Sequence, residues 1–196
     1  MTAMRYKSGH KEKTRTMVLN EAAGQLLAAG PEGMHVADIM LKVGLTHGGF
    51  YAHFASKDEL IVAAIHHKCA NSRAVFQKYV EGRSPADGMR CLIDGYLSTR
   101  HRDAVTTGCP MPRLLGALPN LSREARGALA TGLTRSTAII ARQLKRLGHP
   151  GATDLARSIC AELVGTLSLA RVWGNSRTSE NILRNARSEL KRRLAL

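Results

Sequence analysis

The segment that decides the fold is Val36–Phe54, VADIMLKVGLTHGGFYAHF, which divides into two short helices at Gly44. Before Gly44, apolar residues recur at helical spacing, as in Val36, Ile39, Met40 and Val43. Gly44 suits the left-handed conformation that ends a helix, and the hydroxyl of Thr46 can accept a hydrogen bond from the N–H of residue 48 or 49. A second helix then turns Phe50 and Phe54 inward. The pattern predicts a helix-turn-helix, whose second helix enters the major groove of DNA.

Two features strengthen this interpretation against an ordinary helix–glycine–helix corner of an all-α protein. The second helix opens with Gly48 and Gly49, and each glycine costs about 1 kcal/mol relative to alanine in a helix. Such a helix gains from glycine where its backbone must approach something closely. Ser56 and Glu59 then form a Ser-x-x-Glu capping box, which opens another helix at Leu60.

Residues 14–60 resemble the TetR/AcrR family of bacterial one-component transcriptional regulators. The matching positions are Thr14-Arg15, Ala22-Ala23, Leu26, Gly30, Ile39, Gly44-Leu45-Thr46, Gly48, Phe50-Tyr51, His53-Phe54, Lys57 and Leu60. Beyond residue 60 the resemblance lies in length, helical content and a terminal helix pair. It implies a DNA-binding domain over residues 1–60 and an effector-binding and dimerisation domain over residues 61–196. The chain departs from the family at His35, where Ser or Thr usually caps the next helix.

The composition favours an all-α protein with an anionic partner. Leucine and alanine dominate the 196 residues, and only three Phe, four Tyr and one Trp are aromatic. The formal net charge of +14 points to nucleic acid. Residues 1–60 carry a net charge of only +1, concentrated near the front, whereas residues 61–196 carry +13. We interpret the C-terminal excess as a solvated, arginine-rich surface.

No sequence feature indicates export, a membrane span or a cofactor. The N-terminus is polar and basic, and the longest apolar run, residues 60–65, is too short to cross a bilayer. Cys69, Cys91, Cys109 and Cys160 show no Cys-x-x-Cys pairing. We therefore expect a cytoplasmic protein with reduced thiols, no membrane partner and no cofactor.

The sequence contains none of the common catalytic motifs, so no enzyme activity is expected. Its acidic residues are scattered, without the spacing of a catalytic carboxylate pair. His66, His67 and Cys69 lie close together and contain metal-ligating atoms. Adjacent histidines on a helix point about 100° apart, however, so these residues are better explained as solvated or boundary positions.

The remaining chain is predicted to be a series of helices. Residues 1–9 are expected to form a disordered basic arm. Helices are predicted over about residues 10–29, 36–43, 47–54, 56–80, 86–100, 110–118, 123–147, 152–173 and 179–194, with a loop over 101–108.

The resemblance assigns phosphate contacts to Thr46, Tyr51 and Lys57, whose polar groups surround the second helix of the helix-turn-helix. Phosphate contacts position a protein on DNA without specifying a sequence. His47 is the side chain expected to reach a base edge, where sequence is specified.

Other residues around this helix have two possible roles. Gly48 and Gly49 are expected to let the backbone approach DNA, although Gly49 lacks the side chain that many family members have there. His53 is expected either to bind DNA or to pack beside Tyr51. Lys11 and Arg15, with Lys13, are expected either to reach the flanking DNA backbone or to form a solvated face.

The resemblance implies that the last two helices form a four-helix bundle with a second subunit. The apolar residues expected at this interface are Leu155, Ile159, Leu163, Leu167, Ile182, Ala186 and Leu190. The alternative is that both helices complete the monomer's own core. The dimer is favoured because a palindromic operator requires two DNA-binding domains.

An effector is expected inside the C-terminal domain, again by resemblance. The residues proposed for its pocket are Phe76, Tyr79, Leu92, Tyr96, Cys109, Met111, Arg113, Leu115, Leu133 and Trp173. Such a cavity is mostly apolar and suits a small lipophilic molecule. Arg100, Arg102 and Arg113 flank the adjacent loop. They are expected either to pair with a ligand anion or, as the commoner case, to be solvated.

Cys109 lies where a helix is predicted to begin, near Arg102 and Arg113. Both features lower the pKa of a thiol, so Cys109 is a candidate sensor of oxidants or electrophiles. The simpler explanation is a small residue at a tight turn.

The sequence thus predicts an all-α, homodimeric, ligand-responsive transcriptional regulator, and most simply a repressor on a palindromic operator. Two alternatives remain open. A sequence-tolerant architectural DNA-binding protein is consistent with the net charge and with Gly49, and a thiol-based sensing regulator is consistent with Cys109.

Overall fold

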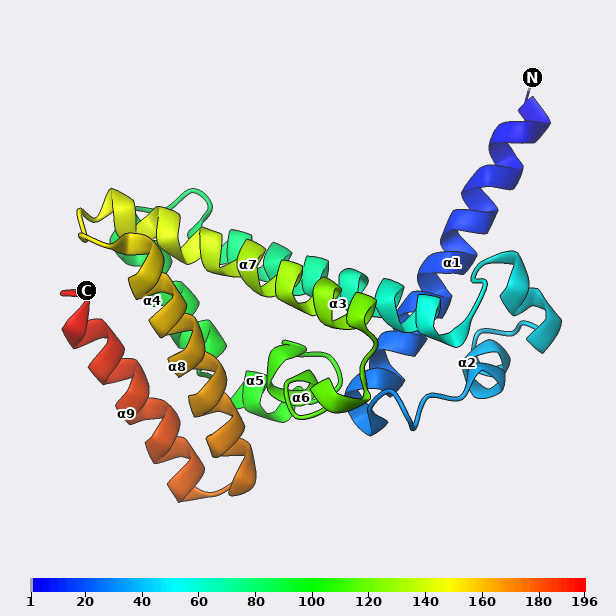
Figure 1. The fold of residues 1–196 in the computed structure, drawn as a ribbon. Helices are drawn as coiled ribbons and strands as arrows, with labels where there is room; N and C mark the ends of the chain where they lie inside the picture. Colours follow the sequence, from blue (N-terminus) through cyan, green and yellow to red (C-terminus); the bar gives the residue numbers. More distant parts are fainter. Residues whose placement is uncertain (1) are drawn as a thin grey trace.

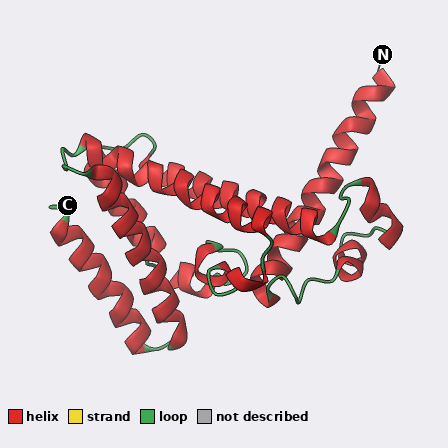
Figure 2. Cartoon of the chain, viewed as in Figure 1, coloured by secondary structure: helices red, strands yellow, loops and turns green. Residues whose placement is uncertain are grey.

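The computed structural model describes the backbone of residues 2–196 and the side chains from residue 11 onward. The elements are α1 (Thr2–Ala29), α2 (Val36–Lys42), η1 (His47–Ala52), α3 (Lys57–Val80), α4 (Pro85–Tyr96), α5 (Thr99–Asp103), α6 (Met111–Leu114), η2 (Leu118–Asn120), α7 (Arg123–Arg146), α8 (Ala152–Val172) and α9 (Arg177–Arg193). The two η elements are 3₁₀ helices. No strand occurs in residues 2–196, which confirms the all-α class (Figure 2). Within the same residues, no helix is long and apolar enough to cross a membrane.

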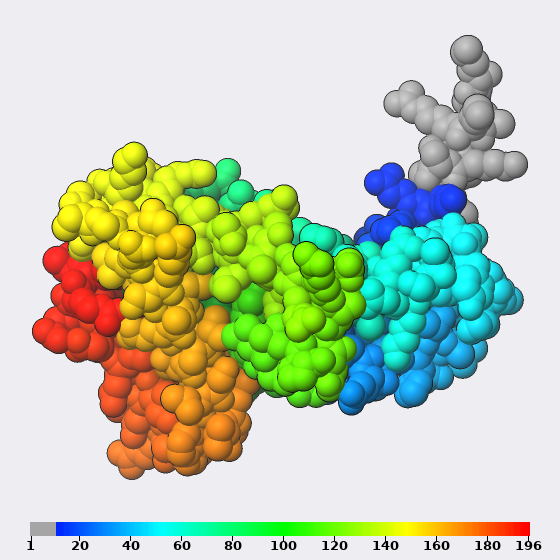
Figure 3. Space-filling view, in the orientation of Figure 1, coloured from blue at the N-terminus to red at the C-terminus, as the bar shows by residue number. Residues whose placement is uncertain are grey.

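The molecule is elongated, with α1, α2 and η1 at one end and α8 and α9 at the other (Figure 1). We call α1, α2 and η1 the headpiece. Helices α3 and α7 lie side by side along the molecule, and the start of α3 packs against α1. Helix α8 packs between α7 and α9. In the space-filling view, the headpiece forms one end of a continuous surface (Figure 3).

Helices α3 and α7 approach each other closely because α7 carries a glycine at the contact. A Cβ atom placed on Gly132 would lie 2.4 Å from Sγ and 2.6 Å from Cβ of Cys69 in α3. Real Cβ atoms essentially never approach another heavy atom so closely, so hydrogen is the only side chain that fits at residue 132.

The structure differs from four predicted segments. Residues 2–9 belong to α1 and form no disordered arm; residue 1, also placed in that arm, lies outside the described residues. The helix predicted over 86–100 is two helices, because the Ser98 hydroxyl accepts a 3.1 Å hydrogen bond from the N–H of His101 and starts α5. The predicted loop 101–108 therefore begins with helix. The helix predicted over 110–118 is shortened to the single turn of α6, which ends before Gly116.

Candidate DNA-binding surface and effector cavities

The turn between α2 and η1 has the geometry that its sequence predicts. Gly44 has a φ of +74°, its N–H donates to the Leu41 carbonyl at 3.0 Å, and the N–H of Leu45 donates to the Met40 carbonyl at 2.9 Å. These two hydrogen bonds are the Schellman pattern, which satisfies the last carbonyls of a helix. The Thr46 hydroxyl then accepts a 3.3 Å hydrogen bond from the N–H of Gly49, which confirms the predicted cap.

The second helix of the motif is η1, a 3₁₀ helix over residues 47–52, where the sequence predicted a helix over about residues 47–54. Its six residues include the adjacent Gly48 and Gly49, which disfavour an α-helix, and short 3₁₀ segments tolerate such sequences. Phe50 and Phe54 are each only 2% exposed and stack with their ring centroids 5.7 Å apart. These two rings attach η1 to the rest of the headpiece, and the opposite face of η1 remains free.

The exposed face of η1 carries most of the predicted DNA contacts. Thr46, His47 and Lys57 are exposed, and Tyr51 is 65% exposed. The rings of His47 and Tyr51 meet edge to face, 6.1 Å apart. Lys57 opens α3 directly after Ser56, whose hydroxyl caps that helix. Four polar side chains thus surround one short helix.

Neither glycine of η1 is required by the chain's own packing. A Cβ atom on Gly48 would meet no atom within 4 Å. One on Gly49 would make ordinary contacts, at 3.6 Å from Oγ1 of Thr46 and 3.7 Å from Cε of Met40. The space above Gly48 is therefore open to a molecule that approaches from outside.

His53 and Arg15 lie together on the side of Phe54. The guanidinium of Arg15 stacks over the Phe54 ring at 4.5 Å, a cation–π contact that holds this side chain on the headpiece. His53 is half-buried beside Phe54, with the two ring centroids 6.4 Å apart. Burial lowers the pKa of His53, and the nearby charges of Lys11 and Arg15 lower it further. Lys11 itself is exposed.

Three adjoining cavities lie among the C-terminal helices. A cavity of about 610 Å³, the vestibule, opens between α3, α4 and residues 98–109. A groove of about 920 Å³ runs between α7 and α8, and an inner cavity of about 20 Å³ separates the two. The inner cavity shares Phe76, Tyr96 and Cys109 with the vestibule, and it shares Met111 and Cys160 with the α7–α8 groove.

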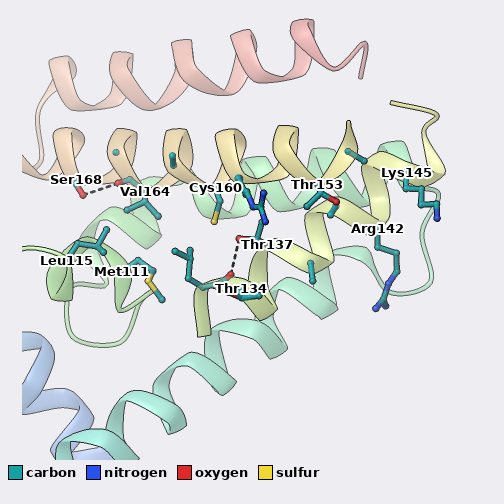
Figure 4. A pocket seen from close by; sticks show the side chains of 17 residues that line it. Met111, Leu115, Thr134, Thr137, Arg142, Lys145, Thr153, Cys160, Val164 and Ser168 are labelled. Carbon is teal, nitrogen blue, oxygen red and sulfur yellow. Dashed lines mark hydrogen bonds between the residues drawn. The ribbon is translucent and has the colours of Figure 1, made fainter. Parts of the chain in front are cut away.

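The α7–α8 groove has an apolar floor and three lining cations, Arg142, Lys145 and Arg157. Figure 4 shows Met111 and Leu115 at one end of the groove and Arg142 and Lys145 at the other. The Thr137 hydroxyl donates to the carbonyl of Leu133 in its own helix at 2.9 Å, so it is not free to bind a ligand.

The residues predicted for the effector pocket divide among these cavities. Phe76, Tyr79, Tyr96 and Cys109 line the vestibule, and Met111, Leu115 and Leu133 line the α7–α8 groove. Leu92, Arg113 and Trp173 line none of the three cavities. Leu92 is fully buried in the core, and Trp173, directly after α8, is 48% exposed.

Two of the three arginines near the predicted pocket bind the protein itself. Arg102 is only 2% exposed. It pairs with Asp103, with 2.7 Å from Nε to Oδ1, and donates to the Ser179 hydroxyl at 3.1 Å. Nε of Arg113 donates to the carbonyl of Leu27 in α1 at 3.2 Å. Arg102 is therefore neither solvated, as the favoured alternative had it, nor free to bind an anion. Arg113 is exposed and lines none of the three cavities, whereas Arg100 does line the vestibule.

The environment of Cys109 is the reverse of the one predicted. Burial raises the pKa of its thiol, because the thiolate would have to form away from water. The expected cations are engaged elsewhere, and α6 has only four residues, so its dipole is small. The expectation of a lowered pKa is therefore wrong.

His101 connects α4 to the segment that carries Cys109. Its Nε2 accepts a hydrogen bond from the Cys109 N–H at 3.0 Å, so Nδ1 carries the proton and donates to the Tyr96 carbonyl at 2.7 Å. Burial is the first cause of its lowered pKa, and the charges of Arg171 and Lys68 also lower it.

We expect acid to destabilise the protein through His53, His67 and His101, whose pKa values are all lowered in the folded chain. As pH falls below about 6.5, the unfolded chain binds protons first. Each group therefore lowers the free energy of unfolding, by at most about 1.4 kcal/mol per pH unit, until its folded pKa is reached. Urea unfolding of wild type and of His101→Gln at pH 7.5, 6 and 5 measures this slope.

The carboxamide of the His101→Gln variant reproduces one donor and one acceptor but does not titrate. The variant should therefore be less sensitive to acid than wild type. Equal slopes for the two proteins would exclude His101 as a source of the pH dependence.

The possible metal ligands on α3 are not gathered. His66 is exposed, Nε2 of His67 lies 2.8 Å from Oδ1 of Asn20, and Cys69 is buried against α7. No group of three His, Cys, Asp or Glu residues placed to hold a metal occurs in the part of the chain that the structure describes.

Most side chains predicted for a dimer interface lie inside the single chain. Ile159, Leu163, Leu167 and Leu190 are fully buried. Leu155, Ile182 and Ala186 are half-buried and pack against the same core.

The exposed apolar residues of α8 are different ones, which we missed. Leu169 and Val172 are 56% and 73% exposed, and they continue a row of exposed small residues, Ala161 and Gly165. The spacing 161, 165, 169 and 172 places all four on one face of α8. We call these four residues the α8 face. The helical spacing of these four residues is visible in the sequence. The buried residues of α8 have the same spacing, so the sequence alone does not show which face is exposed.

Comparison with known proteins agrees with this geometry. Residues 18–64 match the model of the family described as bacterial regulatory proteins, tetR family. A transcriptional repressor of Mycobacterium tuberculosis, Rv3405c, is 24% identical over 112 residues, which are 57% of each chain. The match thus spans little more than half the length of this curated relative.

Solved structures share the fold over nearly the whole chain. Reduced NemR of Escherichia coli superposes with a TM-score of 0.82 at 20% identity, covering 92% of this chain and 96% of NemR. A TetR regulator of Chloroflexus aurantiacus superposes with a TM-score of 0.81 at 23% identity, covering 95% and 96%. The helix-turn-helix geometry and the family match identify residues 18–64 as a domain of the tetR family of bacterial regulatory proteins, and nearly the whole chain shares its fold with a solved TetR regulator.

Proposed function

We propose that this protein is a ligand-responsive transcriptional repressor that binds a palindromic operator as a homodimer. Residues 1–60 bind DNA, and residues 61–196 dimerise and bind the effector. We propose repression as the output because the M. tuberculosis relative is named a repressor.

The observation that carries the proposal is the exposed face of η1. It presents an open backbone at Gly48 with polar side chains of Thr46, His47 and Tyr51 around it. The packing of the chain does not require glycine at residue 48, and the space above that residue is open. A helix with such an exposed backbone suits close contact with a DNA groove.

Two features support dimerisation. The α8 face exposes apolar and small residues, and Gly165 allows a second helix to approach closely. Ala161 and Gly165 also line the α7–α8 groove, so a second copy packed on the α8 face would cover part of that groove. The occupant we propose for this surface is therefore the same face of another chain.

A direct route from the cavities to the headpiece supports a ligand response. Met111 in α6 lines both the inner cavity and the α7–α8 groove. Two residues later, Arg113 donates to the Leu27 carbonyl near the end of α1. Movement of α6 therefore moves the headpiece. Half-sites one helical turn apart lie about 34–36 Å apart, so a shift of a few ångströms prevents both headpieces from docking.

Substitutions on η1 should separate DNA positioning from DNA reading. Tyr51→Ala and Lys57→Ala should weaken binding to every sequence alike, because they remove phosphate contacts. His47→Ala should relax the preference at one operator position by about 1–3 kcal/mol. Gly48→Ala should fold normally, since its Cβ meets no protein atom, but should bind DNA more weakly. Fluorescence anisotropy with a selected operator fragment and scrambled DNA, at one salt concentration, measures all four.

Each outcome of this titration has a meaning. Equal wild-type affinity for operator and scrambled DNA would contradict the repressor hypothesis and support an architectural DNA-binding protein. A uniform loss in His47→Ala would remove its role as base reader, and unchanged binding in Gly48→Ala would show that DNA does not approach η1 at that residue.

A further inference from the structure

Cations line both large cavities, but Arg142, Lys145 and Arg157 of the α7–α8 groove are all exposed, whereas one cation of the vestibule, Lys68, is half-buried. Lys68, Lys78 and Arg100 line the vestibule, and no Asp or Glu does. The acidic residues nearest in sequence are paired outside it: Asp94 with Lys191 and Asp103 with Arg102. The vestibule therefore carries positive charge that no carboxylate in its lining balances.

Lys68 is the most constrained of these cations. It is half-buried on α3, and its Nζ donates to the backbone carbonyl of Thr107 on the opposite wall. A neutral carbonyl satisfies one of the three ammonium donors but supplies no charge. Burial lowers the pKa of Lys68, as expected for an ammonium removed from water without a counterion.

The floor of the vestibule is aromatic. The rings of Phe76 and Tyr96 meet edge to face with centroids 5.7 Å apart, and the Tyr79 ring lies against the backbone of Gly95, where a Cβ atom would come within 2.3 Å of it. Tyr96 is 3% exposed, and its hydroxyl has no oxygen or nitrogen partner among the described side chains and meets only the Cys109 thiol, a weak hydrogen-bonding group. A buried hydroxyl whose partner is only a thiol is poorly satisfied, so an oxygen acceptor on a ligand would be stabilised there.

We propose that the vestibule is the effector site and that its effector is a small organic anion with an aromatic body. Lys68 binds the anionic group, the rings of Phe76 and Tyr96 contact the aromatic body, and the Tyr96 hydroxyl donates to an acceptor at its inner end. This assignment rests on the proposed function, which it makes specific.

The same contacts give the ligand a mechanical effect. An anion on Lys68 displaces the Thr107 carbonyl and so releases the segment that leads through Cys109 to α6. Arg113 of α6 binds the end of α1 through the Leu27 carbonyl. Ligand binding is thereby linked to the position of the headpiece.

The site is tested by calorimetry on the full chain without DNA. The probes are 3-phenylpropionate, its uncharged match 3-phenylpropionamide, and phenyl phosphate, which distinguishes a phosphate from a carboxylate source. We expect saturable binding of at least one anion. The amide should bind about tenfold to a hundredfold more weakly than 3-phenylpropionate, because it cannot form a charge-assisted hydrogen bond with Lys68. Lys68→Met should weaken the anion by a similar factor, and Lys68→Arg should restore most of the affinity.

The control variant is Lys145→Met, which removes a cation from the α7–α8 groove and should leave binding unchanged. Arg113→Met should bind the anion like wild type but should no longer release operator DNA when the anion is added. Thermal melting confirms that each variant folds.

Three results would overturn the assignment: no saturable binding of either anion at millimolar concentration, equal binding of acid and amide, or wild-type affinity in Lys68→Met. Anion binding that leaves wild-type operator affinity unchanged would show a site that is not the effector site. If wild type did not prefer operator DNA, the proposed function would be overturned instead. The two failures are distinguishable because the calorimetry is done without DNA.

Discussion

The double substitution Gly165→Glu with Leu169→Glu should yield a folded monomer whose operator affinity is reduced about 10²–10⁴-fold. Both positions are exposed in the single chain, and a Cβ atom on Gly165 meets nothing within 4 Å. The free energy of unfolding of the monomer should therefore change little. Negative charge on both copies of the α8 face would repel the partner, and a monomer engages only one half-site.

Size-exclusion chromatography with light scattering measures the mass, and anisotropy measures operator affinity. Val105→Glu is the matched control, because Val105 is also an exposed apolar residue, at 41%, but lies away from α8. A double variant that remains dimeric, or a wild type that is monomeric at micromolar concentration, would show that the α8 face is not the interface.

Leu163 and Leu167, in contrast, are unsuitable for this test, although the resemblance to the family implied that they lie at an interface. Both are fully buried in the chain's own core. A charge at either position should unfold the protein, because an unpaired buried charge costs more free energy than the fold supplies. Loss of the dimer in such a variant would say nothing about the interface.

Gly132→Ala and Gly127→Ala should change stability in opposite directions, although both lie on α7. A methyl group on Gly132 would overlap the Cys69 side chain of α3 and force the two helices apart. Such overpacking lowers the free energy of unfolding by about 1–3 kcal/mol. Gly127 is exposed with nothing within 4 Å of an added Cβ, so alanine there should raise stability by about 0.5–1 kcal/mol through helix propensity.

Thermal unfolding of both variants measures this difference. Each 1 kcal/mol corresponds to about 2–4 °C in Tm for a chain of this size. A Gly132→Ala variant as stable as wild type would contradict the close approach of α3 and α7. Since the start of α3 packs against α1 of the headpiece and α3 also lines the vestibule, we expect Gly132→Ala also to weaken operator binding.

The sequence by itself determined the features that depend on neighbouring residues. The helix-turn-helix, the left-handed Gly44 and the caps at Thr46 and Ser56 were all predictable, and the structure confirms them. A cap and a Schellman turn are closed by hydrogen bonds within six residues, so their residue types are visible in the sequence.

Only the tertiary structure decided which partner each side chain meets. Arg113 is attached to α1, and Lys68, which no sequence pattern singled out, meets the Thr107 carbonyl across the vestibule. These contacts join residues 86 and 39 positions apart. Periodicity shows that a helix such as α8 has an apolar face, but both the chain's own core and a second subunit remove apolar surface from water. The direction of that face is set by the packing of all the helices together, which a local pattern does not contain.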